Sequence, residues 1–183
     1  GPSGHVPYIW EFDPETGTYD LTVEIDDAPN TFHFYSICSE YDPANGDVLI
    51  SSRGLRRYDP DTNELTYLGN WVNDNLQGSD CLYDPETKTF YDWKGGWLFT
   101  AKVGQDKLLS TQRYRPYMEG TKISVRSGMA LGPDRKIWMW NGERSVYVWD
   151  QSDISAKDFT EVRNEDSPES PEGCGGLDCS RSY

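Results

Sequence analysis

Basic and aromatic residues gather in the segments between the predicted strands, and their types suit the binding of an acidic sugar. The guanidinium group of Arg holds a carboxylate or sulfate through two parallel hydrogen bonds, and flat aromatic rings stack on sugar faces. We therefore predict a binding surface for a glycan, with an anionic uronic-acid polymer as one candidate, or for a protein. The predicted site residues are Arg53, Trp71, Lys94, Trp97, Arg113, Tyr114, Arg115, Tyr117, Arg126 and Arg144.

A simpler interpretation of these cations is also open. Asp74, Glu119 and Glu143 fall in the same segments, and the cations would then pair with neighbouring acids on solvated loops. The connection over residues 111–126 is longer than the other links between units and is the best single candidate for a binding loop.

No catalytic residue is assigned, because the sequence contains no phosphate-binding loop, no HExxH motif and no Ser-His-Asp arrangement. No metal or other cofactor is expected. The enzymatic alternative is a polysaccharide lyase, in which Arg would neutralise the uronate carboxylate and Tyr114, Tyr117 or His33 would remove the adjacent proton. A third alternative is a structural assembly module.

An aromatic residue followed by Asp-Pro, a polar turn and an alternating apolar run recurs along the chain. It begins at Phe12, Tyr41, Tyr58 and Tyr83, and a weaker copy, LGPDRKIWMW, begins at Leu131. Pro presets the backbone for a turn and cannot donate to a β-ladder, while the Asp side chain accepts hydrogen bonds from the turn. Each copy predicts a β-hairpin, so the chain is predicted to be all-β.

The hairpins combine into larger units. Pro85 follows Pro43 by 42 residues and precedes Pro133 by 48, and a period of about 40 to 50 residues with four strands per unit is typical of β-propeller blades. Three units are predicted, over residues 34–68, 79–109 and 127–162. Trp138 and Trp140 are expected to face one side of the third unit and to fill the core between units.

In such units the Asp-Pro turns are predicted to lie on one face. The predicted site residues are expected on the opposite face, so an acidic surface would oppose a basic, aromatic-lined one.

The aromatic-Asp-Pro-x-Thr pattern resembles the repeats of kelch-like, streptogramin-lyase-like and bacterial sensor-kinase propellers over most of residues 6–162. The resemblance implies the fold and is nearly silent about activity, since propellers host many functions. The kelch double glycine is missing from most units, although Gly95 and Gly96 occur in one. The catalytic His pattern of the streptogramin lyases is not recognisable, because the chain holds only His5 and His33.

The two ends of the chain are predicted to share a fourth unit. Residues 6–13 and 18–25 match only the outer two strands of a unit, and the C-terminal GGLDCSRSY resembles GSDCLY, the innermost strand of the second unit. We therefore expect a small propeller of about four blades, with one blade shared between the terminal strands, which would hold the last sheet from both ends of the chain. The alternative is part of a larger propeller or of an oligomeric one.

Composition divides the chain into segments. Residues 1–5 look like the remnant of a cleaved tag, and residues 6–162 hold the propeller units. Residues 163–176 are an acidic, Ser/Pro-rich connection, interpreted as a flexible linker or as an ordered link to a closing strand at residues 177–183.

The four cysteines leave the redox state open. Cys174 and Cys179 flank Gly-Gly-Leu-Asp and are a candidate disulfide if the protein is secreted. Cys38 and Cys81 occupy corresponding apolar strand positions, where we expect buried free thiols. The native compartment is unassigned, and a secreted or extracytoplasmic location is favoured.

Charge and length limit the partners. The net charge of −14 disfavours nucleic acid and anionic membrane surfaces, and no apolar run approaches the roughly 18 residues that cross a bilayer. A chain of 183 residues with 14% aromatics suits one domain with a substantial core. We expect a monomer or a small homo-oligomer.

Overall fold

The computed structural model describes residues 8–24, 38–51, 54–70, 78–94, 97–114, 128–140, 146–150 and 160–162. These residues form four antiparallel β-sheets, as the all-β prediction required. Within the described ranges, no helix is long and apolar enough to cross a membrane.

Sheet A is a two-stranded hairpin, and sheets B, C and D each contain four strands in chain order. Sheet A comprises β1 (Tyr8–Asp13) and β2 (Thr18–Glu24). Sheet B comprises β3 (Cys38–Asp42), β4 (Asp47–Ser51), β5 (Gly54–Asp59) and β6 (Glu64–Asn70). Sheet C comprises β7 (Gly78–Asp84), β8 (Thr89–Lys94), β9 (Trp97–Val103) and β10 (Leu108–Tyr114). Sheet D comprises β11 (Gly128–Leu131), β12 (Ile137–Trp140), β13 (Val146–Trp149) and β14 (Thr160–Val162).

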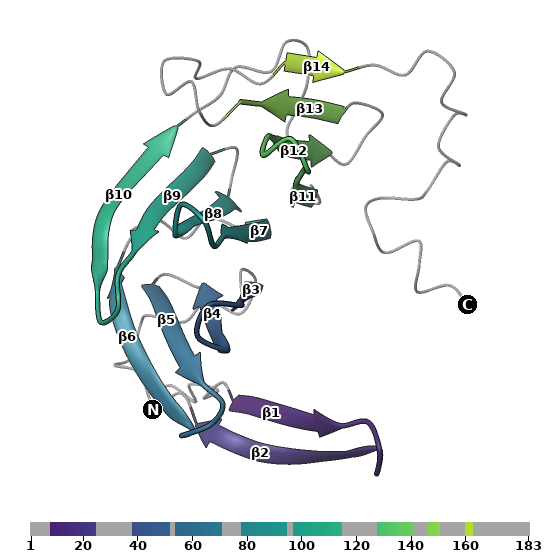
Figure 1. The fold of residues 1–183 in the computed structure, drawn as a ribbon, viewed down its shortest axis with the longest axis vertical. Coiled ribbons are helices and arrows are strands. Elements are labelled where there is room, and N and C mark those ends of the chain that lie inside the picture. Colours follow the sequence, from purple (N-terminus) through teal and green to yellow (C-terminus); the bar gives the residue numbers. More distant parts are fainter. Residues whose placement is uncertain are drawn as a thin grey trace, which may run out of the picture.

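The four sheets follow one another along an open arc (Figure 1). The first strand of each four-stranded sheet lies on the concave side of the arc, and the last strand lies on the convex side. The innermost strands of neighbouring sheets contact one another, β3 with β7 and β7 with β11. This arrangement agrees with the predicted repeat of four-stranded units and with a hairpin at the N-terminal end.

The Asp-Pro motif builds the same turn in each copy because the Asp side chain holds the main chain of the turn. In each of the four Asp-Pro copies, Asp Oδ1 accepts a hydrogen bond from the amide two residues further on, at 2.8 to 3.2 Å. The residue four positions after the Asp has a positive φ, and these residues are Gly17, Gly46, Asn63 and Lys88. The weaker copy has Gly132 in place of the Asp, and Asp134, two residues later in the turn, instead accepts a bond from Lys136 N at 3.2 Å.

Sheets B and C bury an apolar cluster between them. Alternate residues of a strand point to opposite faces, so Leu49 and Leu55 of sheet B meet Phe90, Phe99 and Ala101 of sheet C. All five side chains are almost completely inaccessible to solvent. This cluster fixes the face on which each strand of the two sheets places its apolar residues.

Sheet C packs on sheet D through its other face. Ile137, Met139 and Tyr147 of sheet D contact Tyr91 and Trp93 of sheet C, and all five are buried. Sheet C is therefore covered on both faces, which explains why successive residues of β8 are buried instead of alternating with exposed ones.

The expectation for Trp138 and Trp140 is confirmed in part: both lie on one side of sheet D, but not on the side that packs against sheet C. They alternate with Ile137 and Met139 along β12, so they occupy the opposite face of sheet D and are only partly buried. Their cross-strand partners Val148 and Val146 lie on that same outer face. The spacing of two correctly placed both Trp side chains on one face, but it did not reveal which face meets sheet C.

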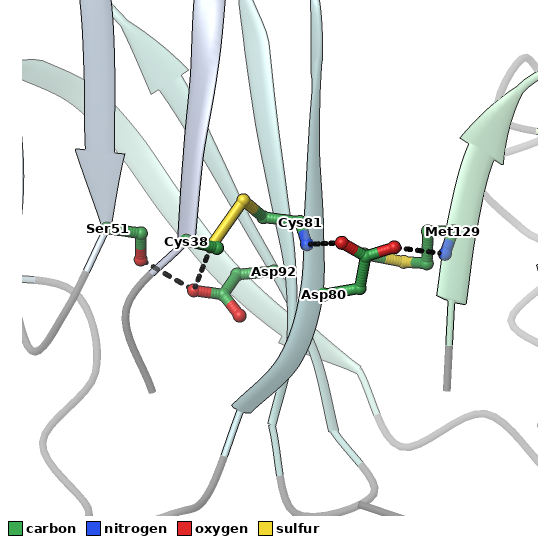
Figure 2. The surroundings of a disulfide bond; sticks show 6 residues. All are labelled: Cys38, Ser51, Asp80, Cys81, Asp92 and Met129. Carbon is green, nitrogen blue, oxygen red and sulfur yellow. Dashed lines mark hydrogen bonds between the residues drawn. A yellow bond between two sulfur atoms is a disulfide. The ribbon is translucent and has the colours of Figure 1, made fainter. Parts of the chain in front are cut away.

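Cys38 and Cys81 form a disulfide that joins the innermost strands of sheets B and C (Figure 2). The expectation of two free thiols is therefore wrong. The two side chains lie on the facing sides of their sheets, and their Cα atoms are 6.1 Å apart, within the range that a disulfide spans. The candidate pair Cys174 and Cys179 lies outside the described residues.

Several other predictions also fall on segments outside the described part of the chain. These are the tag remnant at residues 1–5, the acidic connection at residues 163–176 and the closing strand at residues 177–183. Of the predicted shared fourth unit, the described residues include only the two-stranded sheet A, so the unit stays a prediction.

Candidate functional site

The structure brings four of the ten predicted site residues to one edge of sheet C. The side chains of Trp97 and Arg113 are described, and the backbones of Lys94 and Tyr114 are described with them. The remaining six predicted residues lie outside the described ranges: Arg53, Trp71, Arg115, Tyr117, Arg126 and Arg144.

The register of sheet C explains why these four residues meet. Lys94, at the end of β8, pairs with Trp97, at the start of β9. At the end of β10, Arg113 pairs with Phe99 and Tyr114 pairs with Leu98. Because neighbouring strands are antiparallel, the end of one strand lies beside the start of the next, at the same end of the sheet. Residues separated by up to twenty positions in the sequence thus lie at the same end of the sheet, with Trp97 and Arg113 on the face toward sheet B.

Arg113 lies over the indole ring of Trp97. The guanidinium carbon is 5.0 Å from the ring centroid, which is the geometry of a cation–π contact. Arg113 is exposed, whereas Trp97 is half-buried and packs against the apolar cluster between sheets B and C. The core therefore holds the ring in place while the cation meets solvent.

A second cation–π contact, between Arg56 and Tyr67 in sheet B, differs in its surroundings. The Arg56 guanidinium carbon lies 5.3 Å from the Tyr67 ring centroid, but Arg56 is buried and its Nη1 donates to the carbonyl oxygen of Gly54. Burial lowers the pKa of Arg56 from its ordinary value. Sequence reasoning missed this residue, because nothing in GLRRYD distinguishes the buried Arg from its neighbour.

The predicted separation of an acidic face from a basic one is incomplete. The Asp-Pro turns do lie at the edge opposite Trp97, but cations stand among them. Arg57 forms a salt bridge with Asp47 at 2.9 Å, and Arg135 forms salt bridges with Asp84 and Glu86. That edge is a mixed, internally paired surface.

Carboxyl groups on β7 and β8 link sheet C to its two neighbours, and sequence reasoning missed them. Asp80 Oδ2 accepts a hydrogen bond from Met129 N at 2.6 Å, and Oδ1 accepts one from Cys81 N at 3.0 Å, so Asp80 links sheets C and D (Figure 2). On the other face of sheet C, the buried Asp92 accepts a hydrogen bond from Ser51 Oγ at 2.6 Å. The feature of the sequence that could have pointed to Asp80 is its position between Ser79 and Cys81.

Burial changes the acidity of two carboxyl groups on the innermost strands, Glu40 of β3 and Asp80 of β7. Desolvation, together with the charge of Asp80, raises the pKa of Glu40 to about 7, although a hydrogen bond from the Tyr83 main chain opposes the shift. Desolvation also raises the pKa of Asp80. Within the described residues, no group of three or more His, Cys, Asp or Glu side chains is placed to hold a metal ion. The contacts of these carboxyls are with neighbouring strands, so their evident task is to join sheets.

No protein-family model and no curated protein matches the sequence. Among solved structures, the chain is similar to an auxiliary nutrient binding protein from Bacteroides thetaiotaomicron VPI-5482, with a TM-score of 0.57 at 11% sequence identity. The match covers 83% of this chain and 40% of that one, so this chain spans less than half of its neighbour's length. In total 214 solved chains match, and a fold this widespread leaves the function to be argued from the site.

Proposed function

We propose that this protein is a non-enzymatic binding module that recognises an acidic glycan at the edge of sheet C formed by Lys94, Trp97, Arg113 and Tyr114. The observation that carries the proposal is the Arg113–Trp97 pair, an anchored aromatic ring with an exposed cation over it. An indole ring stacks on the apolar face of a pyranose, and a guanidinium group binds its carboxylate.

Three further observations support this function. The nutrient-binding description of the structural neighbour fits a ligand-binding role. The Asp-Pro repeats and the radial sheets favour a β-propeller with kelch-like repeats, in which sheets B, C and D are blades and sheet A is part of a shared one. The Cys38–Cys81 disulfide favours a secreted or extracytoplasmic protein, because disulfides persist in oxidising compartments.

Titration calorimetry with an oligogalacturonate tests the site. Trp97→Ala and Arg113→Ala should each weaken binding by about 10-fold or more, the equivalent of one lost charge-assisted or stacking contact. Arg113→Lys keeps the charge but removes the planar fork, so it should recover only part of the affinity. Lys107→Ala is the matched control, because this exposed cation lies in the turn at the opposite edge of sheet C.

Two results would contradict the proposal. Equal binding by the wild type and both alanine variants would remove the glycan site from this edge. An increase in ultraviolet absorbance on incubation with polygalacturonate would instead indicate an unsaturated product, and the protein would be a lyase.

A further inference from the structure

The buried carboxyl group of Asp92 lies beside the disulfide that joins sheets B and C (Figure 2). Its Oδ2 atom is 3.9 Å from Cys38 Sγ and accepts a hydrogen bond from Ser51 Oγ at 2.6 Å. An oxygen–oxygen distance this short is typical of a hydroxyl group that donates to an ionised carboxylate. The structure therefore places a negative charge next to one of the two sulfur atoms.

The strand register accounts for this position. In sheet C, Asp92 of β8 pairs with Cys81 of β7. In sheet B, Ser51 of β4 pairs with Cys38 of β3. Because paired residues of neighbouring strands share a face, these side chains all lie where sheets B and C face one another. Asp80 precedes Cys81 and so lies on the other face of sheet C, toward sheet D (Figure 2).

A charge at this position is costly for the fold. Asp92 is completely buried, and it alternates along β8 with Phe90, which belongs to the apolar cluster between the two sheets. Replacing a hydrogen-bonded polar pair by apolar groups of the same shape can be nearly neutral for stability. The Ser51–Asp92 bond alone therefore does not account for a carboxylate here, and the neighbouring sulfur atom points to a further task.

The two sulfur atoms differ in how easily a reductant reaches them. Cys81 is 2% exposed, whereas Cys38 is only partly buried. A thiolate that reduces the disulfide therefore approaches Cys38 Sγ, the sulfur beside Asp92. The S–S bond breaks, Cys81 leaves as a thiolate, and the reductant becomes joined to Cys38. A second thiolate then attacks the reductant sulfur of this mixed disulfide, releases the Cys38 thiolate and forms the oxidised, disulfide form of the reductant.

We propose that Asp92 protects the Cys38–Cys81 disulfide against reduction by small thiols through the charge of its carboxylate. The attacking group is a thiolate anion, so the carboxylate raises the free energy of its approach to Cys38 Sγ. The apolar surroundings screen this repulsion less than water does. The protection preserves the covalent link between β3 and β7, and with it the apolar cluster against which Trp97 packs.

Reduction rates of the full chain test the proposal with two thiols of opposite charge, the anionic 2-mercaptoethanesulfonate and the cationic cysteamine. Quenching with iodoacetamide and peptide mass spectrometry follow Cys38 and Cys81 separately from the other cysteines. Asp92→Asn should speed reduction by the anionic thiol about 10-fold or more, because it removes a charge close to the attacked sulfur. It should speed reduction by cysteamine by no more than about 3-fold, because the ammonium group loses an attraction.

Three further variants complete the experiment. Asp80→Asn is the matched control: it removes the same charge from β7 on the face toward sheet D, so both rates should change by less than about 2-fold. Asp92→Glu keeps the charge and should retain most of the protection against the anionic thiol. Asp92→Ser removes the charge with a smaller side chain and provides the same test if Asp92→Asn does not fold.

Three results would overturn the proposal. Equal reduction rates in the wild type and Asp92→Asn would show that the charge does not protect the disulfide. An equal acceleration with both thiols would show that the substitution only loosens the junction between the sheets. A first mixed disulfide trapped on Cys81 instead of Cys38 would show that the reductant does not pass Asp92. The rates are measured without a glycan, so the outcome is independent of the proposed binding function.

Discussion

The two faces of sheet C are joined to their neighbours in different ways. At the junction with sheet B, an apolar cluster is supplemented by the Cys38–Cys81 disulfide and by the buried hydrogen bond between Ser51 and Asp92. At the junction with sheet D, the apolar cluster is supplemented by the Asp80–Met129 main-chain bond and, near the Asp-Pro turns, by salt bridges.

This comparison separates two ways of fixing neighbouring repeats. The B–C junction is fixed covalently on the concave side of the arc, so its inner strands stay together even when packing is weakened. The C–D junction has no covalent link among the described residues, so packing of side chains such as Met139 carries more of its stability. Sheets B and D have the same arrangement of four strands, so the difference between the two junctions arises from a few side chains.

Removing the disulfide should have the largest effect. Cys38→Ala combined with Cys81→Ala should lower the free energy of unfolding by up to about 4 kcal/mol, because the bond closes a loop with a sequence separation of 43 residues. Urea denaturation of the wild type with and without reductant should give a similar difference. The stability of the double variant should not change with reductant. An equally large change in the double variant would show that the reductant acts through the other cysteines.

Truncating the C–D core should have an effect of comparable size. Met139 is fully buried, so Met139→Ala should cost about 2 to 5 kcal/mol through lost burial and the cavity left behind. The loss should be the same with and without reductant, because the disulfide lies at the other junction. Ala130→Ser, at an exposed position on the outer face of sheet D, is the control and should change the stability little.

The smallest effect on stability should come from a change of pH, which acts through Glu40 at the B–C junction. The pKa of Glu40 is raised to about 7 in the folded protein from an ordinary value of 4.5, so the folded state binds more protons than the unfolded state between these values. The stability that Glu40 contributes is therefore present below pH 4.5 and is lost as the pH rises through 7.

The size of this loss should be of the order of 1 kcal/mol, since solvent screens a half-exposed group. Urea denaturation at intervals from pH 4.5 to 7.5 measures it. Glu40→Gln should flatten this part of the pH profile relative to the wild type, and Glu64→Gln, at an exposed position, should leave the profile unchanged. Parallel profiles for the wild type and Glu40→Gln would contradict the role given to Glu40.

Strands and turns followed from the sequence because their determinants are local. The Asp-Pro copies fix the hairpins through bonds that reach only two residues along the chain, and alternation fixes which residues share a face. The meeting of Lys94, Trp97, Arg113 and Tyr114 was also predictable in outline, since antiparallel order alone brings them to one edge.

Contacts between sheets did not follow from the sequence. The disulfide, the Ser51–Asp92 bond and the side of sheet D that meets sheet C all depend on how one sheet stacks on the next. Trp138 and Met139 are both large and apolar, so composition does not decide which of them faces inward. Six of the ten predicted site residues lie outside the described ranges and stay predictions.

The position of the disulfide has a mechanical consequence for sheets B and C. It ties β3 to β7 on the concave side and leaves the convex strands β6 and β10 without a covalent tether between them in the described structure. Relative rotation of the two sheets would then pivot about the tied strands, and its amplitude would grow with distance from that pivot. Thermal motion is thus expected to loosen the outer rim while the spacing of the inner strands stays constant.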